Sequence, residues 1–192
     1  MDWRTATRLA TLDWVESIIV CRVATFRRLN RKRLALLSEA AICLLFAKVI
    51  VRVVPFSRMA PHLGVFMRPT DSPAASERAP ASDVHAELAG QIGWAVSRAA
   101  RVVPFPAVCL PQAIAARLML DRRRISSVLR LGAAKGAQKP LDAHAWLDAA
   151  GVHVTGYPLQ IGLAEVACFV WDADAAPTGR TTPRRLFRRG QA

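Results

Sequence analysis

The segment around Cys109 constrains the fold more than any other part of the sequence. It reads Val-Pro-Phe-Pro-Ala-Val-Cys109-Leu-Pro-Gln-Ala-Ile-Ala-Ala-Arg-Leu-Met-Leu, so a proline-marked loop leads to the cysteine and an apolar periodic run follows it. Pro111 then falls in the first helical turn, where the missing N–H of proline costs nothing. The pattern predicts a helix from Cys109 to about Arg124, with the thiol at or near its N-terminus.

This position favours a reactive thiol. The N-terminal end of a helix stabilises negative charge, and the thiolate is the nucleophilic form of cysteine. Further along, Leu141-Asp-Ala-His144-Ala-Trp146-Leu is a short alternating stretch, typical of a strand. A strand there can bring the His144 imidazole beside the thiol as a general base. Taken singly, a cysteine in an alanine-rich helix is more often buried and inert, so the prediction rests on the pair.

The remaining periodicity predicts an α+β fold. A Cys109 helix would pack on a small antiparallel sheet that carries His144, after a helical N-terminal region. A further helix starts near Asp83 with Ser82 as its cap. The other helices are expected over residues 3–29 and 34–54, and the strands over 126–131, 143–147, 152–155 and 161–171. The expected regions are 1–67 (N-terminal helices), 68–82 (linker), 83–172 (core) and 173–192 (basic tail).

The turn Ala149-Ala150-Gly151 predicts a hairpin. With a two-residue loop at Ala149-Ala150, His144 lies opposite Thr155 and Trp146 lies opposite His153. Strand alternation then gathers these four side chains on one face of the sheet. We expect the cysteine helix to dock on that face.

Three motifs together resemble the leader peptidases (B proteins) of lasso-peptide biosynthesis: Cys109-Leu-Pro-Gln-Ala, Arg122-Arg-Arg-Ile-Ser-Ser-Val-Leu-Arg-Leu-Gly132 and Ala143-His144-Ala-Trp146. The apolar helix closed by Arg52-Val-Val-Pro-Phe56 is also similar to the N-terminal region of that family. The resemblance covers roughly residues 34 to 160, and its specificity lies in the joint pattern. It implies a papain/transglutaminase-like core.

The resemblance also implies an activity and partners. Cys109 would attack the leader's scissile amide with His144 as base, and water would resolve the acyl-enzyme. The partners would be a precursor peptide with its leader and an ATP-dependent cyclase that closes a macrolactam. Because residues 1–67 read as helical, without the strand hairpin of the family's recognition domain, we expect a separate protein, or an unusual use of the N-terminal helices, to capture the leader. We expect no cofactor and no metal, since the histidines lack zinc-site spacing.

The third member of a catalytic triad stays open. In the family an aspartate is often found on the next strand, at the position that Gly156 holds here. Thr155, Gln160 and Asp142 are weak candidates for orienting the imidazole. Trp146 is either a core residue or a wall of the substrate site. The missing aspartate keeps a second interpretation open, in which the protein is an inactive scaffold that docks precursor and cyclase.

Charge and cysteine usage bear on location. The net charge is +13. Hydrophobic residues make up 53% of the chain, and this content excludes wholesale disorder. Such charge is typical of nucleic-acid binding, yet no zinc-finger spacing or RNA-binding aromatic signature occurs. The four cysteines show no pairing pattern and the start does not resemble a signal peptide, so we expect a cytoplasmic protein. The uncharged run Ala40–Ala47 is too short to span a bilayer. For the helix over 34–54 we favour burial in the core, then a partner interface, with a membrane surface least favoured.

Overall fold

The structure is a computed structural model, and it describes residues 30–68, 82–135 and 141–173. The helix expected over residues 3–29 lies outside these residues, as does almost all of the expected linker and basic tail. The described helices are α2 (Arg31–Val53), α3 (Phe56–Leu63), α4 (Asp83–Ala100) and α5 (Cys109–Asp121). The strands are β1 (Val65–Met67), β2 (Ser127–Ala134), β3 (Asp142–Ala149), β4 (Val152–Thr155) and β5 (Ala164–Trp171).

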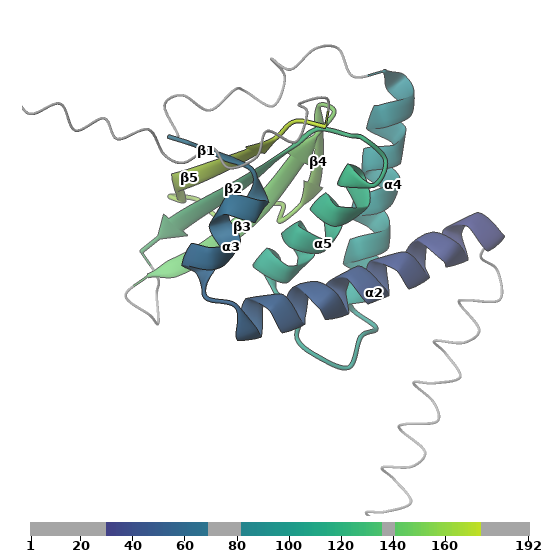
Figure 1. The fold of residues 1–192 in the computed structure, drawn as a ribbon, viewed down its shortest axis with the longest axis horizontal. Helices are drawn as coiled ribbons and strands as arrows, with labels where there is room; N and C mark the ends of the chain where they lie inside the picture. The colour runs from purple at the N-terminus through teal and green to yellow at the C-terminus, as the bar shows by residue number, and fades with distance from the viewer. Residues whose placement is uncertain (1–29, 69–81, 136–140, 174–192) are drawn as a thin grey trace, which may run out of the picture.

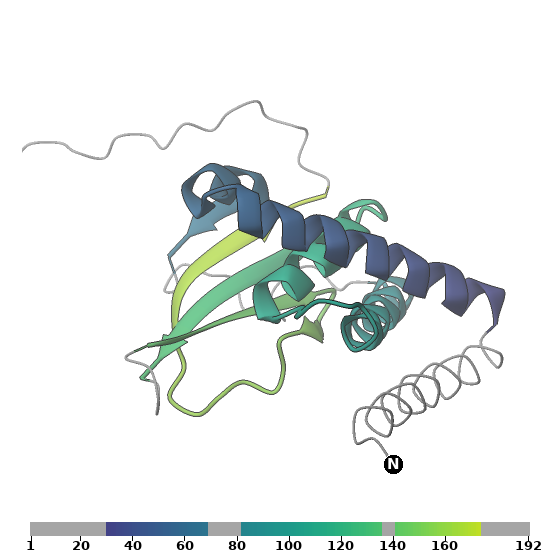
Figure 2. The ribbon, with the colours of Figure 1, turned by 90° about the horizontal axis from the view of Figure 1, so that it is seen from below.

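The five strands form one antiparallel sheet in the order β1-β5-β2-β3-β4. Helix α5 packs against β3, α4 packs against β4, and both helices cover the same face of the sheet (Figure 1). Helix α2 crosses the outside of α4 and α5 and contacts both (Figure 2). Helices therefore form two layers on one side of the sheet, and the predicted α+β fold is confirmed.

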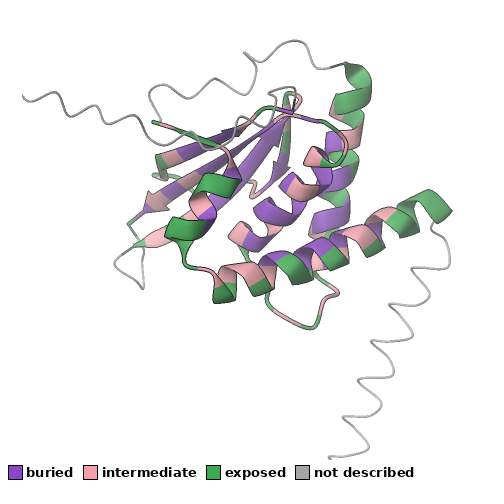
Figure 3. Cartoon of the chain, in the orientation of Figure 1, coloured by how far each residue is buried: buried purple, intermediate pink, exposed green. Residues whose placement is uncertain are grey.

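The hydrophobic core lies between the helices and the sheet (Figure 3). Met119 and Leu120 of α5 and Leu129, Leu147 and Phe169 of the sheet are buried in one cluster. Helices α4 and α5 contribute many alanines to this cluster, and their small side chains let helix and sheet approach closely. A smaller apolar cluster, Val128, Cys168 and Val170, lies apart from it.

The helix boundaries follow the signals in the sequence. Helix α4 starts after Ser82, whose Oγ accepts the His85 backbone N–H at 3.3 Å. Helix α5 begins at Cys109, as predicted from the preceding prolines and from Pro111. Helix α2 ends just before Pro55, which cannot continue an α-helix. Helix α3 and strand β1 were not predicted, since both are short and α3 contains a proline.

The predicted register of the β3–β4 hairpin is wrong. Thr155 pairs with Leu147, and His153 pairs with Asp148 across a bulge between Leu147 and Asp148. The two-residue turn is Ala150-Gly151, with φ of 51° and 75°. Two successive positive φ angles are the signature of a type I′ turn, which favours glycine at its second position. The loop therefore lies one residue later than expected.

The expected docking face of the cysteine helix is also wrong. Ala145, Leu147 and Ala149 belong to the core cluster that includes α5. Strand alternation places His144 and Trp146 on the opposite face of β3. The small apolar side chains suit the close contact with α5, so packing selected this face.

Candidate active site

The Cys109 thiol is free, partly exposed and on the first residue of α5. Two hydrogen bonds hold the loop before it. Gln112 Nε2 donates to the Ala107 carbonyl at 2.6 Å, and Lys48 Nζ donates to the Pro106 carbonyl at 3.1 Å from α2. The Cys109 backbone N–H lies in the first helical turn, where amides have no intrahelical acceptor. It is thus placed to donate to an oxyanion formed at the thiol.

The His144 ring is held by the main chain. Its Nε2 lies 2.6 Å from the carbonyl oxygen of Gly156. A carbonyl oxygen only accepts hydrogen bonds, so Nε2 must carry the proton and donate. In the neutral ring Nδ1 then keeps its lone pair and can accept a proton. Gly156 is the position at which the sequence lacks the aspartate of the similar family, and its backbone oxygen contacts the histidine there.

Trp146 packs beside this histidine. The two rings are stacked, with centroids 6.2 Å apart and an interplanar angle of 19°. Trp146 is 4% exposed and covers Gly132, where an added Cβ would come within 2.8 Å of the indole. Gly132 is opposite His144 in the β2–β3 register, so its lack of a side chain makes room for the indole. Trp146 therefore restricts the orientation of the imidazole.

The structure brings Cys109 and His144 onto neighbouring elements without a hydrogen bond between them. Within the described residues, the ring of His144 bonds to Gly156 and the thiol of Cys109 makes no hydrogen bond. Helix α5, which begins with Cys109, packs against β3, which carries His144. The hydrogen bond to Gly156 uses Nε2 of His144, so Nδ1 is the ring nitrogen that remains for a contact with the thiol.

Among the described residues, none of the three candidates for a third residue forms a hydrogen bond with His144. Thr155 is opposite Leu147, and its buried Oγ1 has no partner among the described residues. Asp142 is opposite Ala134 at the start of β3, and Gln160 is exposed. In this structure the Gly156 carbonyl is the group that orients the ring.

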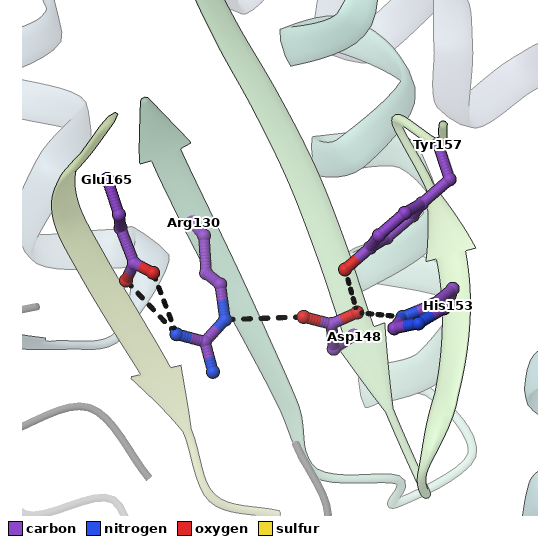
Figure 4. Close-up of polar contacts among 5 residues, drawn as sticks. All are labelled: Arg130, Asp148, His153, Tyr157 and Glu165. Carbon is purple, nitrogen blue, oxygen red and sulfur yellow. Dashed lines mark hydrogen bonds and ion pairs between the residues drawn. The ribbon is translucent and has the colours of Figure 1, made fainter. Parts of the chain in front are cut away.

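A second polar group of residues, which the sequence did not predict, lies on the sheet face away from the helices (Figure 4). Arg130 Nη1 donates to both carboxylate oxygens of Glu165 at 3.1 and 3.0 Å. Its Nε donates to Asp148 Oδ2 at 3.2 Å. Asp148 Oδ1 accepts the Tyr157 hydroxyl at 2.6 Å and lies 2.9 Å from His153 Nδ1. Arg130 and Asp148 are buried, and the ion pairs satisfy their charges.

This network fixes the chain next to the His144 acceptor. Tyr157 directly follows Gly156, and its ring also stacks on His153 with centroids 4.0 Å apart. Burial, together with the hydrogen bond to Asp148, raises the pKa of Tyr157, so the phenol stays protonated and continues to donate. The network therefore anchors the segment that presents the Gly156 carbonyl. The signal in the sequence was a charged residue within each of two apolar strands, Arg130 in β2 and Asp148 in β3.

The described residues contain no group of three or more His, Cys, Asp or Glu side chains that could hold a metal ion. The arrangement has a cysteine at a helix start and a histidine on a strand that packs against this helix, as papain-like and transglutaminase-like enzymes do. Those enzymes orient the histidine with a side chain, whereas a main-chain carbonyl takes that place here.

The family model of the transglutaminase-like superfamily matches residues 50–165, more than half of the chain. The protein therefore belongs to the transglutaminase-like superfamily, whose members include cysteine proteases and transglutaminases. The match contains both Cys109 and His144. No match was found among the curated proteins or among the solved structures.

Proposed function

We propose that the protein is a cysteine endopeptidase that removes the leader from a lasso-peptide precursor. The observation that carries the proposal is the hydrogen bond from His144 Nε2 to the Gly156 carbonyl, within a transglutaminase-like domain. The Gly156 carbonyl holds the Nε2 proton, so Nδ1 is the nitrogen free to take the proton of a thiol. Cys109, at the start of α5, is the cysteine that the same domain provides on a helix N-terminus.

The proposed reaction is amide hydrolysis in two steps. His144 Nδ1 takes the proton from Cys109, and the thiolate attacks the scissile carbonyl carbon. The Cys109 N–H donates to the oxyanion, and the imidazolium then protonates the leaving amine as the C–N bond breaks. Water, deprotonated by His144, attacks the thioester, releases the leader carboxylate and restores the thiol.

The lasso-peptide substrate is supported by the joint sequence pattern around Cys109, Gly132 and His144 and by the apolar helix before it. The same resemblance supplies the proposed partners. These are the precursor peptide, a separate leader-recognition protein and an ATP-dependent cyclase that receives the cleaved core peptide.

The test mixes the full chain with a precursor peptide and a recognition protein and follows leader release by mass spectrometry. We expect Cys109→Ala and His144→Ala to lower the rate by about a thousandfold or more, as removal of a nucleophile or base does. Cys43→Ala is the matched control, because Cys43 is buried in the core, and it should cleave like the wild type. Leader release that survives Cys109→Ala would exclude this thiol as the nucleophile.

A second function, an inactive scaffold that docks precursor and cyclase, is favoured by the absence of a hydrogen bond between the Cys109 thiol and His144 within the described residues. Alkylation of Cys109 by iodoacetamide at neutral pH separates the two. If the pair assembles in solution, His144→Ala slows the alkylation, because the thiolate loses its proton acceptor. An unchanged rate supports the scaffold.

A further inference from the structure

Helix α2 has one face packed into the fold and one apolar face on the surface. Leu37, Ala40, Leu44 and Ala47 are buried against α4 and α5. Other parts of this helix are exposed, as the green segments of α2 in Figure 3 show, and large apolar side chains are among those exposed there. Five of these apolar side chains are at least half exposed: Ile42 (68%), Leu45 (54%), Phe46 (52%), Val49 (51%) and Val53 (73%). We call these five residues the outer face of α2.

The charge around the outer face has one sign. Residues 30–68 contain a single acidic side chain, Glu39, whose carboxylate lies 2.7 Å from Arg123 and 3.5 Å from Arg122. The same stretch carries seven cationic side chains at both ends of α2 and beyond it: Arg31, Lys32, Arg33, Lys48, Arg52, Arg58 and Arg68. The exposed surface of this region is therefore apolar and cationic.

We propose that the outer face of α2 docks on the surface of an anionic lipid bilayer. Its apolar side chains would enter the interface between headgroups and acyl chains, and the flanking arginines and lysines would bind lipid phosphates. The uncharged run Ala40–Ala47 alone is too short to span a bilayer, but the whole of α2 has a mean hydropathy of 2.3 over an 18-residue window. By length and composition the whole helix could therefore cross a membrane. This inference is independent of whether Cys109 is catalytic.

The packing of α2 decides how the helix meets the bilayer. A share of 28% of that window is buried inside the protein, and the buried residues contact α4 and α5. A helix that keeps these contacts cannot be surrounded by lipid on all sides, so it lies parallel to the membrane surface. A bilayer fits this face better than a protein partner does, because protein interfaces combine apolar contacts with regular hydrogen bonds. The exposed polar side chains beside the outer face are few: Ser38, whose hydroxyl donates to the Ala35 carbonyl, and Arg52, a cation suited to lipid phosphate.

The experiment uses the full chain and two kinds of vesicle, one of phosphatidylcholine alone and one of phosphatidylcholine and phosphatidylglycerol in equal parts. We expect co-sedimentation with the anionic vesicles, weaker binding to the neutral ones, and loss of binding at high salt. The variant Phe46→Ser/Val49→Ser should bind anionic vesicles about tenfold or more weakly, because it removes inserted apolar groups.

Two matched variants control this result. Val84→Ser removes an apolar side chain on the first turn of α4 that is more exposed (64%) than Phe46 or Val49, and this variant should bind like the wild type. Arg52→Gln/Arg58→Gln keeps the outer face and removes two cations, so it should lose anionic selectivity. Thermal unfolding of each variant shows whether it remains folded, which we expect because every substituted side chain is exposed.

Three results would overturn the proposal. The first is no binding of the wild type to anionic vesicles. The second is equal binding by the wild type and by Phe46→Ser/Val49→Ser, which would assign the lipid contact to another part of the chain. The third is a dimer in the absence of lipid that the same variant dissociates, which would make the outer face an interface between two copies.

Discussion

Gly156 combines two demands that only glycine meets. Its φ is +85°, a region that side chains rarely adopt. A Cβ built there would collide with the Ala145 carbonyl oxygen and would lie 2.7 Å from the Trp146 Cα. The close approach of backbone to backbone is what brings the Gly156 oxygen to His144. An aspartate at this position is therefore incompatible with the local path of the chain, and the main chain takes its place.

We predict that Gly156→Asp does not restore a triad. It should lower the free energy of unfolding by about 2–4 kcal/mol, since backbone strain and a steric clash add up. Gly151→Ala is the control, because Gly151 has a similar φ of +75° and open space around its Cβ position. It should cost only about 1 kcal/mol, the strain alone. Urea unfolding measures both values, and a Gly156→Asp variant as stable as the wild type would show that this segment moves freely.

At the scale of elements, Glu39 joins α2 to the end of α5. Arg123 Nη2 donates to Glu39 Oε2 at 2.7 Å and Nη1 donates to Oε1 at 3.1 Å, a bidentate pair. The hydrogen bond from Arg123 lowers the pKa of Glu39, against the opposing effect of partial burial. A carboxyl with a lower pKa in the folded state stabilises the fold above its ordinary pKa of 4.5, and loses this effect as pH falls through the folded value.

The expected outcome is a pH-dependent cost of Glu39→Gln. At pH 7 the variant should be about 1 kcal/mol less stable, because the pair is bidentate but only partly shielded from water. The difference from the wild type should shrink steadily below pH 4.5 in urea titrations. Glu87→Gln, an exposed acid of α4, should show a small difference at all pH values. A cost of Glu39→Gln that is constant with pH would mean that packing, not charge, is lost.

Local chemistry allowed most elements to be predicted. Proline and serine signals placed the starts of α4 and α5. Alternation, a turn signal and an apolar run together placed four of the five strands. The predicted register of the β3–β4 hairpin was wrong, although the sequence carries a local signal for the correct one. Gly151 favours the second position of a type I′ turn, and we placed the loop one residue too early. The bulge between Leu147 and Asp148 has no such signal. The bulge leaves Asp148 opposite His153, and Asp148 also bonds to Arg130. Periodicity in the sequence cannot predict this contact, because Arg130 and Asp148 lie on different strands.

At the scale of the whole molecule, the contact between the helical layer and the sheet depends on Gly93 of α4. A Cβ at this position would collide with the Val154 carbonyl oxygen of β4. The helix therefore lies directly on the strand backbone. The candidate site could be predicted only in part, because it also depends on contacts between elements that are far apart in the sequence. The sequence placed Cys109 on a helix and His144 on a strand, but which face of β3 meets α5 is decided by packing across the molecule.

We expect opposite effects from two glycines of the same helix. Gly93→Ala should lower the free energy of unfolding by about 2–4 kcal/mol, because α4 must move away from β4. Gly90→Ala should raise it by up to about 1 kcal/mol, since Gly90 has open space and alanine favours a helix. Chemical denaturation of the two variants compares them directly. Equal effects would show that α4 does not rest on β4 as described.

The sheet ends on both sides in a very short strand. The outermost strands, β1 and β4, have three and four residues, whereas each of the three strands between them has eight. A border strand of three or four residues offers few main-chain groups to another chain, so growth of the sheet from these two strands is disfavoured. Association through exposed apolar side chains is thus favoured over extension of the sheet from β1 or β4.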